Sequence, residues 1–244
     1  MALDSIELPT SEVEALNNIL KIVSNVGIDN ILIESDHESS ILSGVNGDNS
    51  IILFCHHELP SVLSCMNLVL PNIKMVLARI KSLKDYQCYI KVDDESLEVE
   101  QMEFLTQDGK VVIPCLNFES NKKHFPRMQV DPSTVFSVYK TKEQLTFLNE
   151  QLKSFGQKGR KAGKLSFYNE DGLSMSFDDG ENNSYVESLS IDEEIEVSYP
   201  LTSIYTLFRE SHRVEKELNA FVMDSDFLQI TIDNITLHVV PSVE

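Results

Sequence analysis

Apolar residues recur at helical spacing in two segments that each begin with a capping signal. Ser11-Glu-Val-Glu14 has the S-x-x-E pattern of a capping box, and Thr141-Lys-Glu-Gln144 has the related T-x-x-Q pattern. An apolar stripe follows each signal, and a glycine closes it, Gly27 in the first segment and Gly156 in the second. The pattern predicts a helix after each cap.

A second pair of predicted helices follows Pro71 and Pro200, and each has apolar residues on one face. The two prolines are 129 residues apart, the two caps 130 and the two closing glycines 129. Three pairs of landmarks at nearly one offset indicate a structural unit that occurs twice, even where the side chains differ.

Between the helices, apolar and polar residues alternate in short runs that turn residues separate, which is typical of antiparallel strands with one covered face. The predicted strands are 30–34, 40–45, 50–55, 61–70, 87–92, 96–100 and 110–118 in the first half, and 135–139, 164–168, 172–177, 185–191, 194–199, 218–223, 227–232 and 235–240 in the second. Residues 119–134 have no period and are interpreted as a linker. The predicted fold is α+β, with two helices on a mainly antiparallel sheet in each of two domains, 1–118 and 135–244.

The composition is that of a globular protein, with 42% apolar and 24% charged residues, but the 244-residue chain carries a net charge of −19. Such a chain is not drawn to nucleic acid or to an anionic membrane by its overall charge. No apolar run is long enough to span a membrane, and the first residues lack the features of a signal peptide. The four cysteines are scattered, as expected of reduced thiols. We therefore expect a soluble intracellular protein without a membrane partner.

The few basic residues are clustered. Seventeen of the twenty lie in four short stretches, three of which are on or directly beside predicted helices, whereas residues 178–196 hold eight acids and no base. Lysines often do no more than solvate a helix face. The segregation as a whole predicts one basic and one acidic surface, which suits a protein that touches a polyanion on one face only.

Patterns typical of catalysis or metal binding are weak. The stretch from Gly156 to Lys164 lacks the spacing and the Ser or Thr of a phosphate-binding loop, and a strand follows its GXXG where a KH domain requires a helix. His56 and His57 point to opposite faces of a predicted strand and cannot easily share one zinc ion. The acidic turn at 178–183 lacks EF-hand spacing. We expect no enzyme, no metal and no cofactor.

The duplicated helix-and-sheet unit, the linker, the acidic total and the basic helices together resemble a DNA sliding clamp. The resemblance is to the trimeric type built from two-domain subunits, as in the proliferating-cell-nuclear-antigen and T-even phage clamps, and it covers nearly the whole chain. It implies a homotrimeric ring, with sheets outside and helices lining a hole that admits double-stranded DNA. It also implies a processivity factor for a DNA polymerase, loaded by a separate ATPase, here in a viral or phage system.

Three sets of site residues follow from this resemblance. The residues expected to face DNA are Lys21, Lys74, Lys81, Lys84, Lys142, Asn149, Lys153, Lys158, Arg160, Lys161, Arg209 and Arg213. Those expected at the subunit interface are Val111, Val112, Ile113, Cys115, Tyr185, Val186 and Leu189. Those expected to form the pocket for a partner peptide are Phe125, Met128, Val130, Val240 and Pro241.

One alternative stays open at this point. The same fold and acidity would suit a clamp-like transcription factor or scaffold that never encircles DNA. The expected location is the cytoplasm, which is the host cytoplasm for a phage protein, or the nucleus in a eukaryotic system.

Overall fold

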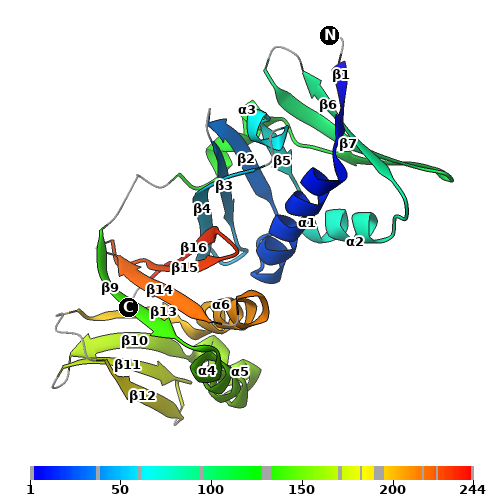
Figure 1. Ribbon diagram of the computed structural model, residues 1–244. Coiled ribbons are helices and arrows are strands. Elements are labelled where there is room, and N and C mark those ends of the chain that lie inside the picture. The colour runs from blue at the N-terminus through cyan, green and yellow to red at the C-terminus, as the bar shows by residue number, and fades with distance from the viewer. Residues whose placement is uncertain are drawn as a thin grey trace. The chain divides into compact units, whose positions relative to one another are not determined.

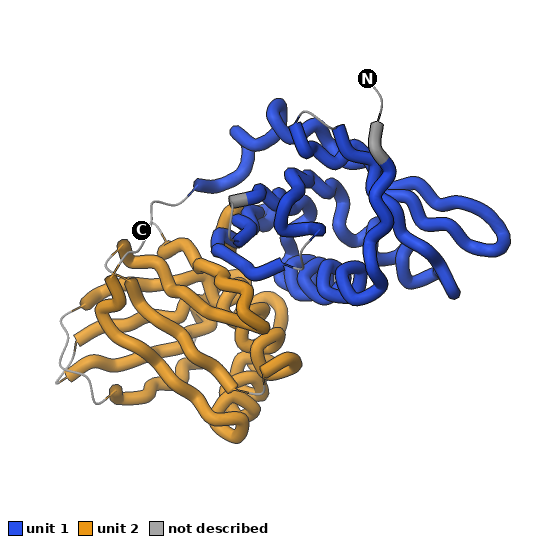
Figure 2. The backbone as a smooth tube through the Cα atoms, turned by 45° about the horizontal axis from the view of Figure 1, so that its top comes forward, with its two compact units in different colours: residues 1–47, 53–128 blue, residues 48–52, 129–244 orange. Residues whose placement is uncertain are grey.

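The computed structural model describes residues 3–36, 39–59, 62–93, 96–127, 133–169, 172–181, 183–189, 195–215, 217–223 and 225–242. The chain divides into two compact units, which Figure 2 shows in different colours. Unit 1 comprises Met1–Gly47 and Leu53–Met128, and unit 2 comprises Asp48–Ile52 and Gln129–Glu244.

Unit 1 contains strands and helices in a strand–helix–strands–helix–strands order (Figure 1). Its elements are β1 (Leu3–Leu8), α1 (Thr10–Asn25), β2 (Ile31–Asp36), β3 (Ser39–Val45), β4 (Ile51–His57, whose first two residues group with unit 2), η1 (Leu63–Cys65), β5 (Leu68–Leu70), α2 (Ile73–Lys81), β6 (Gln87–Asp93), β7 (Glu98–Thr106), β8 (Gly109–Pro114), α3 (Phe118–Asn121) and η2 (Lys122–His124).

The strands of unit 1 form two layers of antiparallel pairs, in the orders β1-β6-β7-β8 and β5-β2-β3-β4. Helices α1 and α2 pack against each other. Their apolar stripes, with Leu16 and Leu20 on α1 and Val76 on α2, are fully buried against the sheets, where burial of each large side chain contributes about 1.5–3 kcal/mol.

Unit 2 repeats this order. Its elements are β9 (Thr134–Lys140), α4 (Lys142–Ser154), α5 (Gly156–Ala162), β10 (Lys164–Asn169), β11 (Leu173–Asp178), β12 (Ser184–Ser188), β13 (Val197–Pro200), α6 (Leu201–Val214), β14 (Leu218–Met223), β15 (Leu228–Ile232) and β16 (Ile235–Val239).

The strands of unit 2 again form two antiparallel layers, β12-β11-β10-β13 and β16-β15-β14-β9. An aromatic cluster fills the core, in which the Phe167 ring lies edge-to-face against Phe136 and Tyr199. The predicted α+β class, with a helix-and-sheet unit that occurs twice, is confirmed.

Several predicted elements differ in their limits. Strand β1 has no counterpart in the prediction, and within the predicted strand 61–70 residues 68–70 form strand β5, because 63–65 form a 3-10 turn. Residues 156–162, for which the sequence pattern predicts no helix, form helix α5. Gly156 adopts a φ of +68°, so it does interrupt the helix as expected, but the chain turns into a new helix at once.

The predicted capping box of α1 is wrong. Pro9 occupies the N-cap position without a side-chain cap, and the helix begins at Thr10, one residue before Ser11. The predicted box at Thr141 is present, because the Thr141 side chain accepts from the Gln144 N–H and the Gln144 side chain accepts from the Thr141 N–H. A proline already supplies the right φ before α1, so that end forms without the hydroxyl.

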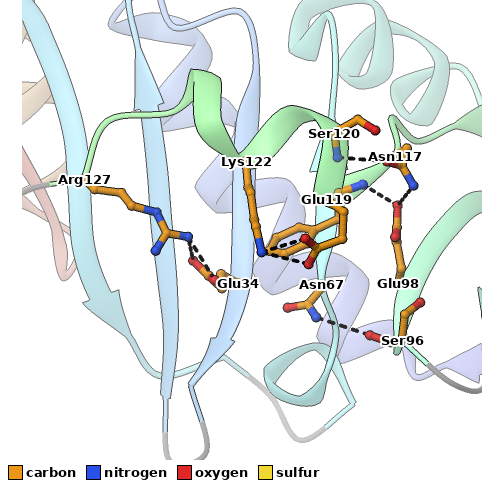
Figure 3. Close-up of polar contacts among 10 residues, drawn as sticks. Glu34, Asn67, Ser96, Glu98, Asn117, Glu119, Ser120, Lys122 and Arg127 are labelled. Atoms are coloured by element: carbon orange, nitrogen blue, oxygen red, sulfur yellow. Dashed lines mark hydrogen bonds and ion pairs between the residues drawn. The ribbon is translucent and has the colours of Figure 1, made fainter.

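The first part of the predicted linker is folded onto unit 1, as Figure 3 shows. Phe118 is buried with Leu32 and Val69, and Phe125 packs against this cluster. Polar contacts hold the segment at both ends: Glu98 accepts from the Asn117 side chain at 2.8 Å and from the Phe118 N–H, and Arg127 donates to Glu34 at 2.9 Å. Unit 1 thus extends past residue 118, the boundary that we predicted. Residues 128–132 lie outside the described residues.

Candidate nucleic-acid interface

The helices of unit 2 form one surface that carries exposed cations. Helices α4, α5 and α6 contact one another and lie side by side in Figure 1. The apolar stripes of α4 and α6 face the sheets, so the polar side of each of these two helices is left for solvent. The exposed cations of this surface, called here the helix face of unit 2, are Lys142, Lys153, Lys158, Lys161, Arg209 and Arg213.

The helices of unit 1 carry fewer cations. Lys21 on α1 and Lys74 and Lys81 on α2 are exposed, and Lys84 follows the end of α2. Because α1 and α2 pack together as the first and last of the unit-2 helices do, the two units present the same kind of surface.

Carboxylates neutralise three of these predicted DNA-facing cations. Lys74 pairs with Asp29 at 3.2 Å, Lys158 with Glu181 at 2.9 Å, and Arg213 with the buried carboxylate of Glu210. The exposed pairs of Lys74 and Lys158 contribute little to stability, but all three pairs reduce the net field of the surface. Within the described part of the chain, the remaining cations have no carboxylate partner: Lys21, Lys81, Lys84, Lys142, Lys153, Arg160, Lys161 and Arg209.

Two of the predicted DNA-facing residues have roles in helix packing. The Asn149 side chain donates to the Leu145 carbonyl at 3.0 Å and to the Phe208 carbonyl at 3.3 Å, so it joins α4 to α6. Arg160 Nη1 donates to the carbonyls of Leu152 and Lys153 at the end of α4. Such contacts satisfy carbonyls that have no partner within the helix.

Strand β8 is an edge strand of its sheet. The Cys115 N–H donates to the Glu100 carbonyl across to β7. Along an antiparallel strand, the backbone N–H and C=O groups of successive residues point alternately toward the paired strand and away from it. Because those of Cys115 point toward β7, those of Lys110 and Val112 point to the free edge. At that edge the Val112 carbonyl accepts from Arg79 of α2 at 3.1 Å.

Strand β12 is an edge strand in the same way. The Leu189 N–H donates to the Leu173 carbonyl across to β11. The alternation of the ladder then turns the backbone groups of Val186 to the free edge.

The side chains predicted at the subunit interface are not equally accessible. Ile113 is buried in the core of unit 1, and Val111, Val112, Tyr185 and Leu189 are half-buried. Val186 is 53% exposed. Burial raises the pKa of the half-buried Cys115 thiol to about 12, so this thiol is not reactive at neutral pH.

An apolar patch lies beside the free edge of β12. Phe147 on α4 is 46% exposed and contacts Tyr185, whose ring also packs near Phe177. A cavity of about 270 Å³ opens here, and at its wall the buried Lys140 ammonium pairs with Glu187 at 2.5 Å. Exposed apolar groups next to an open edge are typical of a protein contact.

The residues predicted for a partner peptide are distributed over both units. Phe125 is half-buried on unit 1, and Met128 and Val130 lie outside the described residues. In unit 2 the Val240 N–H donates to the Ser50 carbonyl, and Pro241 lines a cavity of about 870 Å³ above β10 and β13. Side chains of both charges line this cavity, including Lys164, Asp178 and Glu196.

Among the described residues, no group of three or more His, Cys, Asp or Glu side chains is placed to hold a metal ion. No described helix has the length and apolar character of a membrane span.

Comparison with known proteins gives solved structures only, because no protein-family model and no curated protein sequence matches the chain. The structure of the PCNA2–PCNA3 complex from Sulfolobus tokodaii matches with a TM-score of 0.61 and 12% identity, over 99% of this chain and 100% of that one. The beta clamp of H. pylori, solved with 5-chloroisatin, matches with a TM-score of 0.64 and 16% identity.

The DnaN sliding clamp (DNA polymerase III subunit beta) of Pseudomonas aeruginosa, solved with griselimycin, matches with a TM-score of 0.60 and 16% identity. The chain spans 64% of the length of each of these two bacterial clamps, whereas it spans all of the archaeal subunit. The chain has the fold of the DNA sliding clamps.

Proposed function

We propose that this protein is the subunit of a ring that encircles duplex DNA and tethers a DNA polymerase as a processivity factor. The observation that carries the proposal is the helix face, which holds cations without carboxylate partners in the described part of a chain whose net charge is −19. A surface of this kind attracts phosphates where the rest of the molecule repels them. In this tethering role the protein catalyses no reaction.

The proposed ring is a homotrimer. The resemblance to clamps implies six similar domains around the DNA, and a chain with two such units supplies six in three copies. A head-to-tail contact closes into a ring when its rotation is right. Edge strands β8 and β12 offer the two unlike surfaces that such a contact needs.

Binding to DNA inside this ring is electrostatic and independent of sequence. Cations spread over several helices neutralise phosphates without reading base edges, so affinity falls steeply with salt. The tether itself is topological, since a closed ring slides along the duplex without leaving it.

The partners follow from the same proposal. A polymerase binds the ring through a peptide at Phe125, Met128, Val130, Val240 and Pro241, and a separate ATPase loads the ring onto DNA. A two-unit chain this divergent from the archaeal subunit fits a viral or phage replication system.

The assembly is tested with two proline variants that each damage one edge. Val112→Pro and Val186→Pro remove N–H groups that point away from their own sheets, so each unit should fold normally, because proline is tolerated on edge strands. We expect the wild type to be a trimer at micromolar concentration by native mass spectrometry, and each variant to be monomeric.

A mixture of the two variants gives the control. Each variant retains the edge that the other lacks, so an equimolar mixture should form a dimer with one intact contact and no ring. Val111→Pro, which removes an N–H that β7 needs, should instead lower the melting temperature. A monomeric wild type, or a trimer that both variants leave intact, would contradict the proposed contact.

The encircling role is tested on closed and open DNA. A circular plasmid should retain the protein through a high-salt wash, and cutting the plasmid once should release it. Equal retention on both forms would support the alternative of a clamp-like factor that does not encircle DNA.

A further inference from the structure

In unit 2, the guanidinium groups of two arginines lie close to the ring of one tyrosine. The Arg160 guanidinium, at the end of α5, lies 4.3 Å from the centre of the Tyr205 ring on α6. The Arg209 guanidinium lies 5.7 Å from the same ring centre. Tyr205 and Arg209 are four residues apart on one helix, so their side chains are neighbours on its surface.

Backbone contacts fix the position of this cluster. Arg160 Nη1 donates to the carbonyls of Leu152 and Lys153 at 3.0 and 3.1 Å, and the Thr202 hydroxyl donates to the Arg160 carbonyl at 2.8 Å. The ends of α4 and α5 and the start of α6 are thereby tied together. Arg160 is half-buried, whereas Arg209 is exposed.

The charges of the cluster are not neutralised within the described part of the chain. The nearby Lys158 is paired with Glu181, whereas Arg160 and Arg209 have no carboxylate partner there. Two like charges held at one ring repel each other, and the ring face compensates this only in part. An anion between them would remove the repulsion.

We propose that Tyr205 is a positioning residue that holds Arg160 and Arg209 as a clamp for one phosphate of the DNA backbone. Arg160 uses Nη1 for the helix carbonyls, so its Nε and Nη2 hydrogens remain to donate to phosphate oxygens, and Arg209 supplies a second guanidinium. Lys153 and Lys161 are exposed on the same helix face and favour a ligand with several phosphates over a lone carboxylate. This inference rests on the proposed function and names one fixed contact within it.

The test measures duplex binding as a function of salt. A short labelled DNA duplex is titrated with the full-length protein by fluorescence anisotropy between about 50 and 200 mM salt. Arg209→Gln should reduce the slope of log affinity against log salt by about 1 for each bound subunit. Tyr205→Leu should reduce the slope as well, because both guanidinium groups lose their fixed positions, and Tyr205→Phe should restore the wild-type slope.

Lys123→Gln is the matched control, since it removes one positive charge from an exposed lysine on η2, outside the helix face. It should leave the slope nearly unchanged. Melting temperatures identify a variant that fails to fold, and Arg209→Gln, at an exposed side chain, still tests the clamp in that case. A wild-type slope in folded Tyr205→Leu, or equal losses in Arg209→Gln and Lys123→Gln, would overturn the clamp alone. A wild-type protein that binds no duplex would overturn the proposed function with it.

Discussion

Glu103 on β7 is a buried carboxylate whose charge two neighbouring side chains compensate. Lys110 donates to it at 2.5 Å and Gln101 at 2.6 Å. The hydrogen bond from Lys110 is the main reason why the pKa of Glu103 lies below its ordinary value, although burial acts in the opposite direction. The charged form is thus favoured in the folded state.

We expect Glu103→Gln to lower the free energy of unfolding by about 1 kcal/mol at pH 7. A lowered pKa means that the stabilisation is complete above the unfolded-state pKa, near 4.5, and is lost as the pH falls through the folded-state value. The difference between wild type and variant, measured by urea unfolding, should therefore shrink from pH 7 to pH 3.

The exposed Glu7 on β1 provides the control, and Glu7→Gln should change stability by less than about 0.5 kcal/mol at either pH. A difference for Glu103→Gln that grows on acidification would contradict the assigned cause of the pKa shift.

Two other buried acids accept hydrogen bonds that the sequence pattern did not predict. Glu12 lies within the predicted capping box of α1, but its carboxylate accepts from the N–H groups of Val62 and Leu63, about 50 residues away. Asp179 lies in the acidic turn at 178–183, where it is 2% exposed and accepts from the N–H groups of Glu181 and Asn183. Both acids cap loops, but the donors to Asp179 are only two and four residues away, whereas only the fold brings its donors to Glu12.

At the scale of elements, the two predicted capping boxes can be tested by the same substitution, which removes the hydroxyl expected to cap the helix. Thr141→Ala removes the hydroxyl that accepts from the Gln144 N–H, so α4 should lose about 1 kcal/mol. Ser11→Ala removes a hydroxyl that makes no cap bond in α1, and its effect should stay below about 0.5 kcal/mol. Urea unfolding of both variants measures the difference, and equal losses would mean that Ser11 caps α1 in solution.

The helix stripes were predictable because burial of one face imposes the same period on every helix. The limits of short elements were not. The 3-10 turn at 63–65 and the three-residue strand β5 occupy one apolar run that a single longer strand explains equally well. Contacts with distant residues decide such cases, for example the two N–H groups that Glu12 satisfies.

At the scale of the whole molecule, charge reversal at Lys142 is expected to change DNA binding without lowering the stability of the fold. Lys142 is the first residue of α4, where the helix dipole disfavours a positive charge by about 0.3–1 kcal/mol. We expect Lys142→Glu with Lys153→Glu to leave folding and assembly intact and to weaken DNA binding, with a parallel loss of polymerase stimulation on a long primed template. Each reversal replaces attraction to phosphates with repulsion, and the proposed trimer multiplies it by three.

Lys123→Glu is the control for charge reversal outside the helix face, because this exposed lysine lies on η2. It should reduce DNA binding much less than either single variant, Lys142→Glu or Lys153→Glu. A stronger effect of Lys123→Glu would place the DNA on another surface.

The sequence by itself determined the α+β class, the duplication and the clustering of cations on helices. These properties are local or periodic: a stripe, a turn or a charge run is legible within a few residues, and its repeat at an offset of 129 or 130 needs no contacts. The same signals could not divide the cations into those that are paired and those that are not.

Only the tertiary structure decided that division. Lys74 forms an ion pair with Asp29 and Lys158 with Glu181, and in each pair the two residues are distant in the sequence. The Arg160 guanidinium instead donates to the carbonyls of α4 and contacts the Tyr205 ring. The register of the strands likewise decided that the backbone of Val112 points outward and that of Val111 does not. Charges, rings and strand edges act through distances, and distances between residues far apart in the sequence are set by how the sheets and helices pack.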